Sequence, residues 1–274
     1  MSFKRWIVVV LLVAVAAADP EPQSPVNYRN VDRGGGSDIY ISNRLGCDMT
    51  VTLEFSEQNN VIADPPFPCT RTIPGHQEVL VSRVRQAGAG PWNFRYNYFW
   101  NYGSVYAQHD DSVVYSLPYA SGSSMKINQG YHGKLSHTGD DEYAIDFSFA
   151  SGTGVLAARE GVVVSVEERY SQGGATQYFR NRVNSVRVRH SDGTIGEYDH
   201  FRLQGVEVEE GQRVNRGDLI GYSGATGFVT GAHLHFCVYS AYDGHRRHSY
   251  PIRFMVAGSP VPVELQQGAV YQAP

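Results

Sequence analysis

The sequence of 274 residues predicts a mainly β protein, with a small β-sandwich-like domain followed by a larger, mostly antiparallel β domain. Hydrophobic and polar residues alternate over residues 47–55 (CDMTVTLEF), which is typical of a half-buried strand. In the second half, glycine turns such as Asp192-Gly193 separate short alternating runs. No run with the helical period extends beyond two turns, which also favours a β fold.

The chain begins with the pattern of a secretory signal peptide. Two cationic residues precede an apolar run over residues 6–18, which ends in a small-residue cleavage pattern at Ala16 and Ala18. The run is too short to span a bilayer as a helix, and no later stretch is apolar enough to do so. We therefore expect export, removal of residues 1–18, a mature chain from about Asp19, and no membrane insertion after cleavage.

Composition divides the mature chain into four segments. Residues 19–36 are polar and end in a glycine run, which indicates a linker. Residues 37–120 alternate around a proline-rich irregular stretch and are predicted to form the N-terminal β-rich domain. A junction rich in glycine and serine leads to the second domain, residues 121–256, and we expect residues 257–274 to be a loose tail.

Charge and cysteines narrow the class of protein. Without its two N-terminal cations the chain has 21 of its 23 Lys and Arg residues and 27 Asp and Glu residues, so its net charge is about −6. This negative charge excludes nucleic acid as an electrostatic partner. In an exported protein Cys47 and Cys69 could form a disulfide that stabilises the fold by about 3 kcal/mol. Cys237 could be a metal ligand, although a small buried thiol is the commoner role.

The stretch TGAHLHFCVY (residues 230–239) holds two histidines one residue apart. On a strand His233 and His235 share one face, about 7 Å apart along it, while Leu234 points to the other face. The pair is either two half-exposed polar residues on an ordinary strand or a pair of metal-binding or catalytic imidazoles. The segments around it favour the second interpretation.

Further candidate ligands lie near the ends of other predicted strands, in GYHG (130–133), LSHTGDDEYAIDFS (135–148) and GEYDHF (196–201). Two histidines and one aspartate suit zinc and leave a fourth coordination position open for water. Such an ion lowers the pKa of water to about 7 and polarises a carbonyl group. The histidines outnumber those that one tetrahedral site requires, and the surplus suggests catalytic imidazoles beside the metal.

Four stretches of the sequence, taken in order, resemble the core of lysostaphin-type (LytM-like) zinc metallopeptidases, over about residues 130–256. These stretches are AIDFSFASGTGVLAAREGVV, GEYDHF, VEEGQRVNRGDLIGYSGATG and TGAHLHFCV. The resemblance implies an antiparallel β peptidase domain of the duplicated hybrid type. It also implies an exported endopeptidase with one Zn²⁺ per chain that hydrolyses stem or cross-bridge peptides of bacterial peptidoglycan. It implies nothing about residues 19–120.

The resemblance also implies a set of metal ligands. Asp146 takes the place of the aspartate, because a Gly-Thr turn follows it at the family's spacing, and His235 takes the place of the last histidine. The first ligand departs from the commonest pattern, because His137 precedes Asp146 by nine residues instead of four. His132 is the alternative to His137. Asp141 has the four-residue spacing but would put the Gly-Thr turn out of register.

His200 and His233 match the family's two histidines that are not ligands, so the resemblance implies that they hold the attacking water and stabilise the oxyanion. Tyr143, Tyr198 and Gly231 lie near these positions and are candidates for the substrate groove, although ordinary packing explains the tyrosines equally well. His190 is expected to be structural. The histidines expected to face solvent are His76, His109, His245 and His248, and the stretch GHRRHSY is expected to be a solvated loop.

Three functions follow from these observations. The leading hypothesis is the zinc endopeptidase. A second is a latent or non-catalytic zinc-binding regulator of the same fold, in which the N-terminal domain occludes the groove. A third is a sugar-binding protein that uses the aromatic residues of its N-terminal domain, such as those in WNFRYNYFWNY, for stacking.

Overall fold

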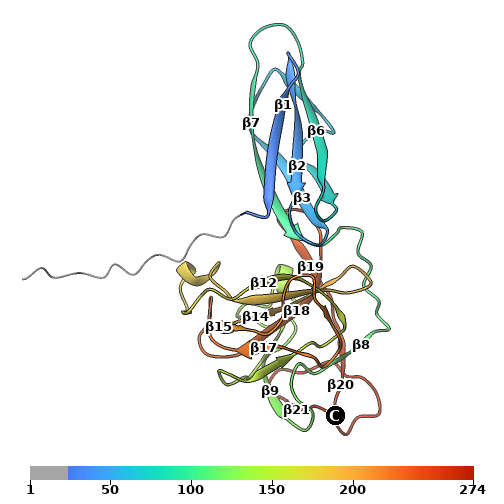
Figure 1. Ribbon diagram of the computed structural model, residues 1–274, viewed down its shortest axis with the longest axis vertical. Coiled ribbons are helices and arrows are strands. Elements are labelled where there is room, and N and C mark those ends of the chain that lie inside the picture. Colours follow the sequence, from blue (N-terminus) through green and yellow to red (C-terminus); the bar gives the residue numbers. More distant parts are fainter. Residues whose placement is uncertain (1–23) are drawn as a thin grey trace, which may run out of the picture.

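The computed structural model describes residues 24–274, and the predicted signal peptide lies outside them. Within the described residues the secondary structure is almost entirely strand, which confirms the mainly β prediction. Figure 1 shows two bodies, an elongated N-terminal one and a broader C-terminal one that holds most of the strands. Among residues 24–274 there is no helix long and apolar enough to cross a bilayer.

Seven strands form the N-terminal body: β1 (Val26–Asp32), β2 (Gly36–Asn43), β3 (Met49–Asn59), β4 (Val61–Asp64), β5 (Cys69–Ile73), β6 (Glu78–Gln86) and β7 (Asn93–Tyr102). They pair as two sheets, in the orders β1-β2-β6-β4 and β5-β3-β7. Ile39 and Val84 of the first sheet and Val51 and Leu53 of the second are fully buried in one shared core. We call this body the sandwich.

The sandwich begins earlier than the sequence predicted. Strand β1 lies inside the expected linker 19–36 and pairs along its whole length with β2. The glycine run is the tight turn of this hairpin, where the amide of Arg33 donates to the carbonyl of Gly36 at 3.0 Å and Gly34 has φ +70°. The linker prediction was wrong for residues 26–36, because β1 is an edge strand that is mostly exposed and lacks a hydrophobic pattern.

The predicted disulfide is absent, and all three cysteines are free and buried. Cys69 pairs with Leu53 on β3, whereas Cys47 precedes Met49 at the start of that strand. Leu53 lies four residues after Met49, a distance of about 13 Å along the strand. A disulfide needs Cα atoms within about 7 Å, so the two thiols cannot meet.

The second body contains the remaining elements: β8 (Val114–Ser116), β9 (Ser124–Gln129), η1 (Gly139–Asp141), β10 (Ile145–Phe147), β11 (Gly154–Leu156), β12 (Gly161–Glu167), η2 (Gln177–Phe179), β13 (Ser185–Arg189), β14 (Ile195–Asp199), β15 (Phe201–Val206), β16 (Arg213–Val214), β17 (Leu219–Ser223), β18 (Leu234–Ala241), β19 (Arg247–Ser249), β20 (Arg253–Met255) and β21 (Val270–Gln272). Its main sheet has the order β16-β12-β13-β14-β18-β10-β9-β21, with β19 also paired to β18. A smaller sheet has the order β11-β17-β15. The predicted turn at Asp192-Gly193 joins β13 to β14.

The expected loose tail is packed instead. Strand β21 pairs with β9, and Leu265 and Ala273 are buried in the core of the second body. Tyr115 also lies in that core, so residues before 120 already belong to its packing. The tail prediction was wrong because an edge strand added at the end of a chain carries little hydrophobic signal of its own.

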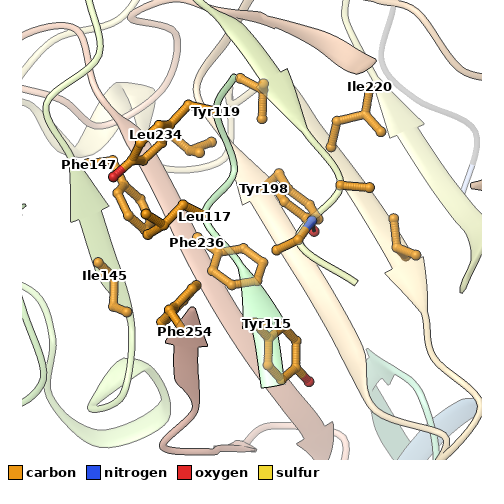
Figure 2. Packing of buried hydrophobic residues seen from close by; sticks show 14 of the residues in the cluster. Tyr115, Leu117, Tyr119, Ile145, Phe147, Tyr198, Ile220, Leu234, Phe236 and Phe254 are labelled. Atoms are coloured by element: carbon orange, nitrogen blue, oxygen red, sulfur yellow. Dashed lines mark hydrogen bonds between the residues drawn. The ribbon is translucent and has the colours of Figure 1, made fainter. Parts of the chain in front are cut away.

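Strand β18 divides two environments. Leu234 and Phe236 point into the core of the second body, against Phe147 and Tyr198 (Figure 2). The opposite face carries the two histidines and then Cys237 and Tyr239, which are buried in the core shared with the sandwich. One face of a single strand therefore carries the candidate site at one end and the contact with the sandwich at the other.

Candidate metal and active site

Sheet pairing brings two predicted ligands together. Asp146 on β10 lies directly opposite His235 on β18 in the antiparallel register. Residues opposite each other on neighbouring strands point to the same face, with Cβ atoms about 5 Å apart. Nearly ninety positions of sequence separate these residues, but the backbone hydrogen bonds between β10 and β18 place them side by side.

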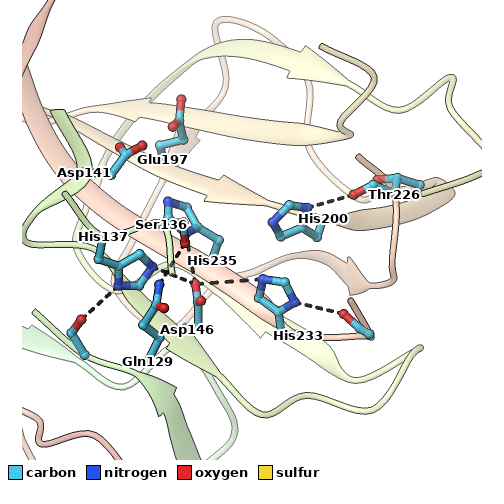
Figure 3. Close-up of polar contacts among 12 residues, drawn as sticks. Gln129, Ser136, His137, Asp141, Asp146, Glu197, His200, Thr226, His233 and His235 are labelled. Carbon is cyan, nitrogen blue, oxygen red and sulfur yellow. Dashed lines mark hydrogen bonds and ion pairs between the residues drawn. The ribbon is translucent and has the colours of Figure 1, made fainter. Parts of the chain in front are cut away.

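Three side chains meet at one point (Figure 3). The Oδ1 atom of Asp146 lies 3.2 Å from Nε2 of His137 and 2.9 Å from Nδ1 of His235. One donor atom from each residue lies within 4.8 Å of the other two. Two imidazole nitrogens and a carboxylate oxygen are ligands that zinc prefers in open sites, so the donor set fits a divalent metal ion.

The loop between β9 and β10 delivers His137. Its ring is fully buried, and Nδ1 donates to the carbonyl of Gly130 at 2.9 Å, which turns Nε2 toward Asp146. The loop includes η1 and accommodates the nine-residue spacing. His132, the alternative, packs its ring 5.1 Å from that of Tyr143 and is not part of this group.

Two further histidines stand beside the group. The ring centroids of His200 and His233 lie 4.5 Å apart, and Nε2 of His233 is 3.8 Å from Oδ1 of Asp146. Nδ1 of His200 donates to the carbonyl of Thr226 at 2.7 Å, and Nδ1 of His233 donates to that of Gly231 at 2.9 Å. A carbonyl only accepts, so each neutral ring carries its proton on Nδ1 and keeps a lone pair on Nε2.

Burial and the charge of Asp146 set the protonation states. Burial lowers the pKa of His200 to about 3, which keeps the ring neutral at ordinary pH. Burial raises the pKa of Asp146, but hydrogen bonds from His137 and His235 outweigh it and hold the pKa far below its usual range. Burial lowers the pKa of His235, but the bond to Asp146 outweighs it and raises the pKa to about 9.

Asp146, His200, His233 and His235 line a cleft of about 520 Å³, whereas His137 is fully buried and is not among its lining residues. Its rim includes Leu135, which is 93% exposed, and Phe228. Among the described residues, all of its lining side chains lie between positions 128 and 247, so the sandwich does not line it. The occlusion that the regulator hypothesis requires therefore finds no support in residues 24–120.

The groove candidates have different outcomes. Gly231 lines the cleft. Tyr143 does not, and packs 5.4 Å from the ring of Tyr131. Tyr198 was wrong as a groove candidate, because it is fully buried on the opposite face of β14 and accepts a hydrogen bond from the amide of Ala158.

The structure adds residues that the sequence interpretation missed. Gly130 and Thr226 contribute backbone carbonyls, which leave no signal in side-chain type. Arg247 was expected in a solvated loop, but it is largely buried and pairs with both Asp141 and Glu197. His109 was likewise expected to face solvent, but its side chain is 4% exposed and stacks on a tyrosine ring.

Known proteins are similar to the part of the chain that contains the candidate site. Residues 140–248 match the model of Peptidase family M23. Peptidoglycan DD-endopeptidase ShyA of Vibrio cholerae is 31% identical over 139 residues, which are 49% of this chain and 30% of that protein. Glycyl-glycine endopeptidase ALE-1 of Staphylococcus capitis is 33% identical over 102 residues, which are 37% of this chain and 25% of that protein.

A solved structure also matches this region. The catalytic domain of lysostaphin from Staphylococcus simulans is 24% identical and covers 46% of this chain and 87% of its own, with a TM-score of 0.33. The chain spans less than a third of the length of the two curated relatives. The resemblance to lysostaphin-type peptidases is confirmed for the second body, whereas the sandwich lies outside the matched residues.

Proposed function

Because residues 140–248 match the peptidase M23 domain, we propose that this chain is an exported zinc endopeptidase that hydrolyses peptide bonds in bacterial peptidoglycan. The relatives named above are peptidoglycan and glycyl-glycine endopeptidases, which supports the substrate class. The signal-peptide pattern of residues 1–18 supports export to the extracellular or periplasmic space.

We assign the metal to His137 through Nε2, Asp146 through Oδ1 and His235 through Nδ1, three atoms that lie close together. A bound zinc ion supplies Lewis-acid chemistry and makes water more acidic. Two sets of backbone contacts hold the proposed ligands in place. The carbonyl of Gly130 orients His137, and the ladder between β10 and β18 sets the distance between the other two.

His200 and His233 carry the proton transfers in this proposal. Each neutral ring keeps its proton on Nδ1 for a backbone carbonyl, so Nε2 is free to accept a proton from the attacking water. Once protonated, the same nitrogen donates a hydrogen bond to the tetrahedral oxygen or returns the proton to the leaving amine.

The convergence of His137, Asp146 and His235 beside a cleft that two further imidazoles line carries the proposal. The test measures zinc content and hydrolysis of purified peptidoglycan by the mature protein, its chelated form and His233→Ala. We expect one zinc per chain, activity that disappears on chelation and returns with zinc, and little activity in His233→Ala. Activity that survives both chelation and this substitution would contradict the assignment.

A further inference from the structure

A second cleft, of about 740 Å³, lies between the sandwich and the main sheet. We call it the interdomain cleft. Leu45, Trp100 and Tyr102 line it from the sandwich, and Ser165 and Arg187 line it from β12 and β13. Neither body forms this cleft alone, so its shape depends on how the two are docked.

The interdomain cleft meets the metal cleft. Asp141, Asp199 and Arg247 line both of them. The side chains of Asp141 and Arg247 remain 32% and 18% exposed although they pair with each other, so they form part of the surface at this junction. The two clefts are therefore neighbours that share these three residues.

Most charged groups along the interdomain cleft are paired. Arg187 and Arg247 both contact Glu197, at 2.6 and 2.7 Å, and Arg247 also contacts Asp141. Asp199 differs, because its Oδ1 atom is buried and has no hydrogen-bond partner among the residues that the structure describes. A buried oxygen without a donor is costly, so this position favours a ligand that brings one.

The interdomain cleft also contains an exposed cation and a half-buried indole ring. Arg44 is exposed, and within residues 24–274 its guanidinium has no acidic partner. Trp100 is half-buried and makes an edge contact with Tyr102 at 5.1 Å between ring centroids. An acid without a donor, a cation without an acid and an indole ring together suit a peptide that carries both an ammonium and a carboxylate group.

We propose that the interdomain cleft binds the segment of the cell-wall peptide that flanks the scissile bond, with Asp199 accepting a hydrogen bond from an ammonium group and Arg44 donating one to a carboxylate. Trp100 packs against the aliphatic part of that segment. This inference rests on the proposed function and extends it, because it makes the sandwich half of the substrate site and Asp199 a determinant of specificity.

The test measures binding of cross-linked muropeptide dimers to the zinc-loaded, full-length His233→Ala protein, so that affinity is read without cleavage. Dimers are compared before and after acetylation of their free amines. We expect acetylation, Arg44→Ala and Trp100→Ala each to raise the Kd by about tenfold or more, as befits the loss of a charged hydrogen bond or a packed ring. Trp92→Ala is the matched control, because Trp92 does not line the cleft.

In the Asp199→Asn variant, acetylation of the dimers should not change the Kd further, because the acceptor for the ammonium group is already altered. Zinc content is measured in the same samples to confirm that the metal site is intact. Affinity that is indifferent to acetylation, Arg44→Ala and Trp100→Ala, or no binding of any dimer, would overturn the inference. Absence of hydrolysis by the unsubstituted protein with binding as described would instead contradict the proposed function alone.

Discussion

At the scale of single residues, backbone carbonyls determine what the histidines can do. His137, His200 and His233 each donate from Nδ1 to a carbonyl, whereas His235 directs Nδ1 to Asp146. These bonds fix which nitrogen of each ring is left for other contacts. His137 makes the same kind of bond as His200 and His233, so the proposed ligand is distinguished by the 3.2 Å distance between its Nε2 and Oδ1 of Asp146.

We predict that His233→Ala separates metal binding from chemistry. The side chain lies beside the ligand group but is not one of its three members. Zinc stoichiometry, measured by elemental mass spectrometry, should stay at one per chain. The rate of peptide hydrolysis should fall by about 100-fold or more, the usual contribution of a positioned acid or base. Asp146→Asn is the contrasting variant and should lose both zinc and activity.

His190 provides a pH prediction away from the metal site. Burial lowers its pKa to about 4, and Nδ1 donates to the carbonyl of Glu160 at 2.9 Å. The unfolded chain binds this proton near pH 6.5 and the folded chain only near pH 4, so stability falls as pH drops through this window. The difference is worth about 3 kcal/mol.

His190→Asn keeps a hydrogen-bond donor but does not titrate. Urea unfolding at pH 7 and at pH 4.5 should therefore show a smaller loss of stability on acidification in the variant than in the unsubstituted protein. Equal losses in the two proteins would show that another group controls the acid response.

At the scale of elements, the corner between β14 and β15 holds His200. The residue has φ +75°, a left-handed conformation that a non-glycine residue adopts only when its surroundings enforce it. Its amide donates to the carbonyl of Asn184 at 2.9 Å, and its carbonyl accepts from the amide of Gly224 at 2.7 Å. These two bonds hold the corner from opposite sides.

We predict that Gly224→Ala disturbs this corner. A Cβ atom at Gly224 would lie 2.6 Å from both the amide nitrogen and the Cα of Arg202, too close for either backbone to remain in place. Overpacking of this kind costs about 1–3 kcal/mol. Hydrolysis should fall with zinc content unchanged, and Gly35→Ala is the control, because a Cβ there meets nothing within 4 Å. Full activity in Gly224→Ala would mean that the corner tolerates displacement.

The regular strands explain which parts of the candidate site could be predicted from the sequence. The resemblance to lysostaphin-type peptidases implied Asp146 and His235 as ligands, and both lie on strands, where the alternation of side chains lets the pairing of β10 with β18 place them on one face. The same alternation places Tyr198 on the face opposite to Asp199, which should have removed it from the groove candidates. The choice between His137 and His132 depended on an irregular loop, in which the direction of a side chain cannot be predicted from a regular alternation of residues.

Other features depended on partners far along the chain. Arg247 is drawn inward by Glu197 and Asp141, which lie 50 and 106 residues away. A stretch of polar residues does not show such pairing. Strands β1 and β21 escaped prediction for a related reason: each is an edge strand held by hydrogen bonds to one neighbour, with little hydrophobic patterning of its own.

At the scale of the whole molecule, the two bodies share a core. Val164, Ile195 and Tyr239 of the main sheet are buried together with residues of the sandwich. The turn after β18 also contacts β3, where the amide of Gly244 donates to Oγ1 of Thr52 at 2.8 Å. The sandwich is therefore packed on the face of the sheet that carries the candidate site.

We predict that Gly244→Ala weakens this docking. A Cβ atom there would lie 2.3 Å from the carbonyl oxygen of Phe99 and 2.6 Å from the amide nitrogen of Thr52. Calorimetry should show a melting temperature lower by several degrees, since about 1 kcal/mol corresponds to about 2–4 °C for a protein of this size. An unchanged melting temperature, like that expected for Gly35→Ala, would show that the contact contributes little to stability.

We propose that His137, Asp146 and His235 together bind one metal ion that keeps a coordination position free for chemistry. Anomalous diffraction at the zinc edge from crystals of the zinc-loaded protein tests it most directly. We expect one strong peak within bonding distance of Nε2 of His137, Oδ1 of Asp146 and Nδ1 of His235, with no fourth protein ligand. A peak elsewhere, or a fourth side chain that closes the coordination shell, would contradict it.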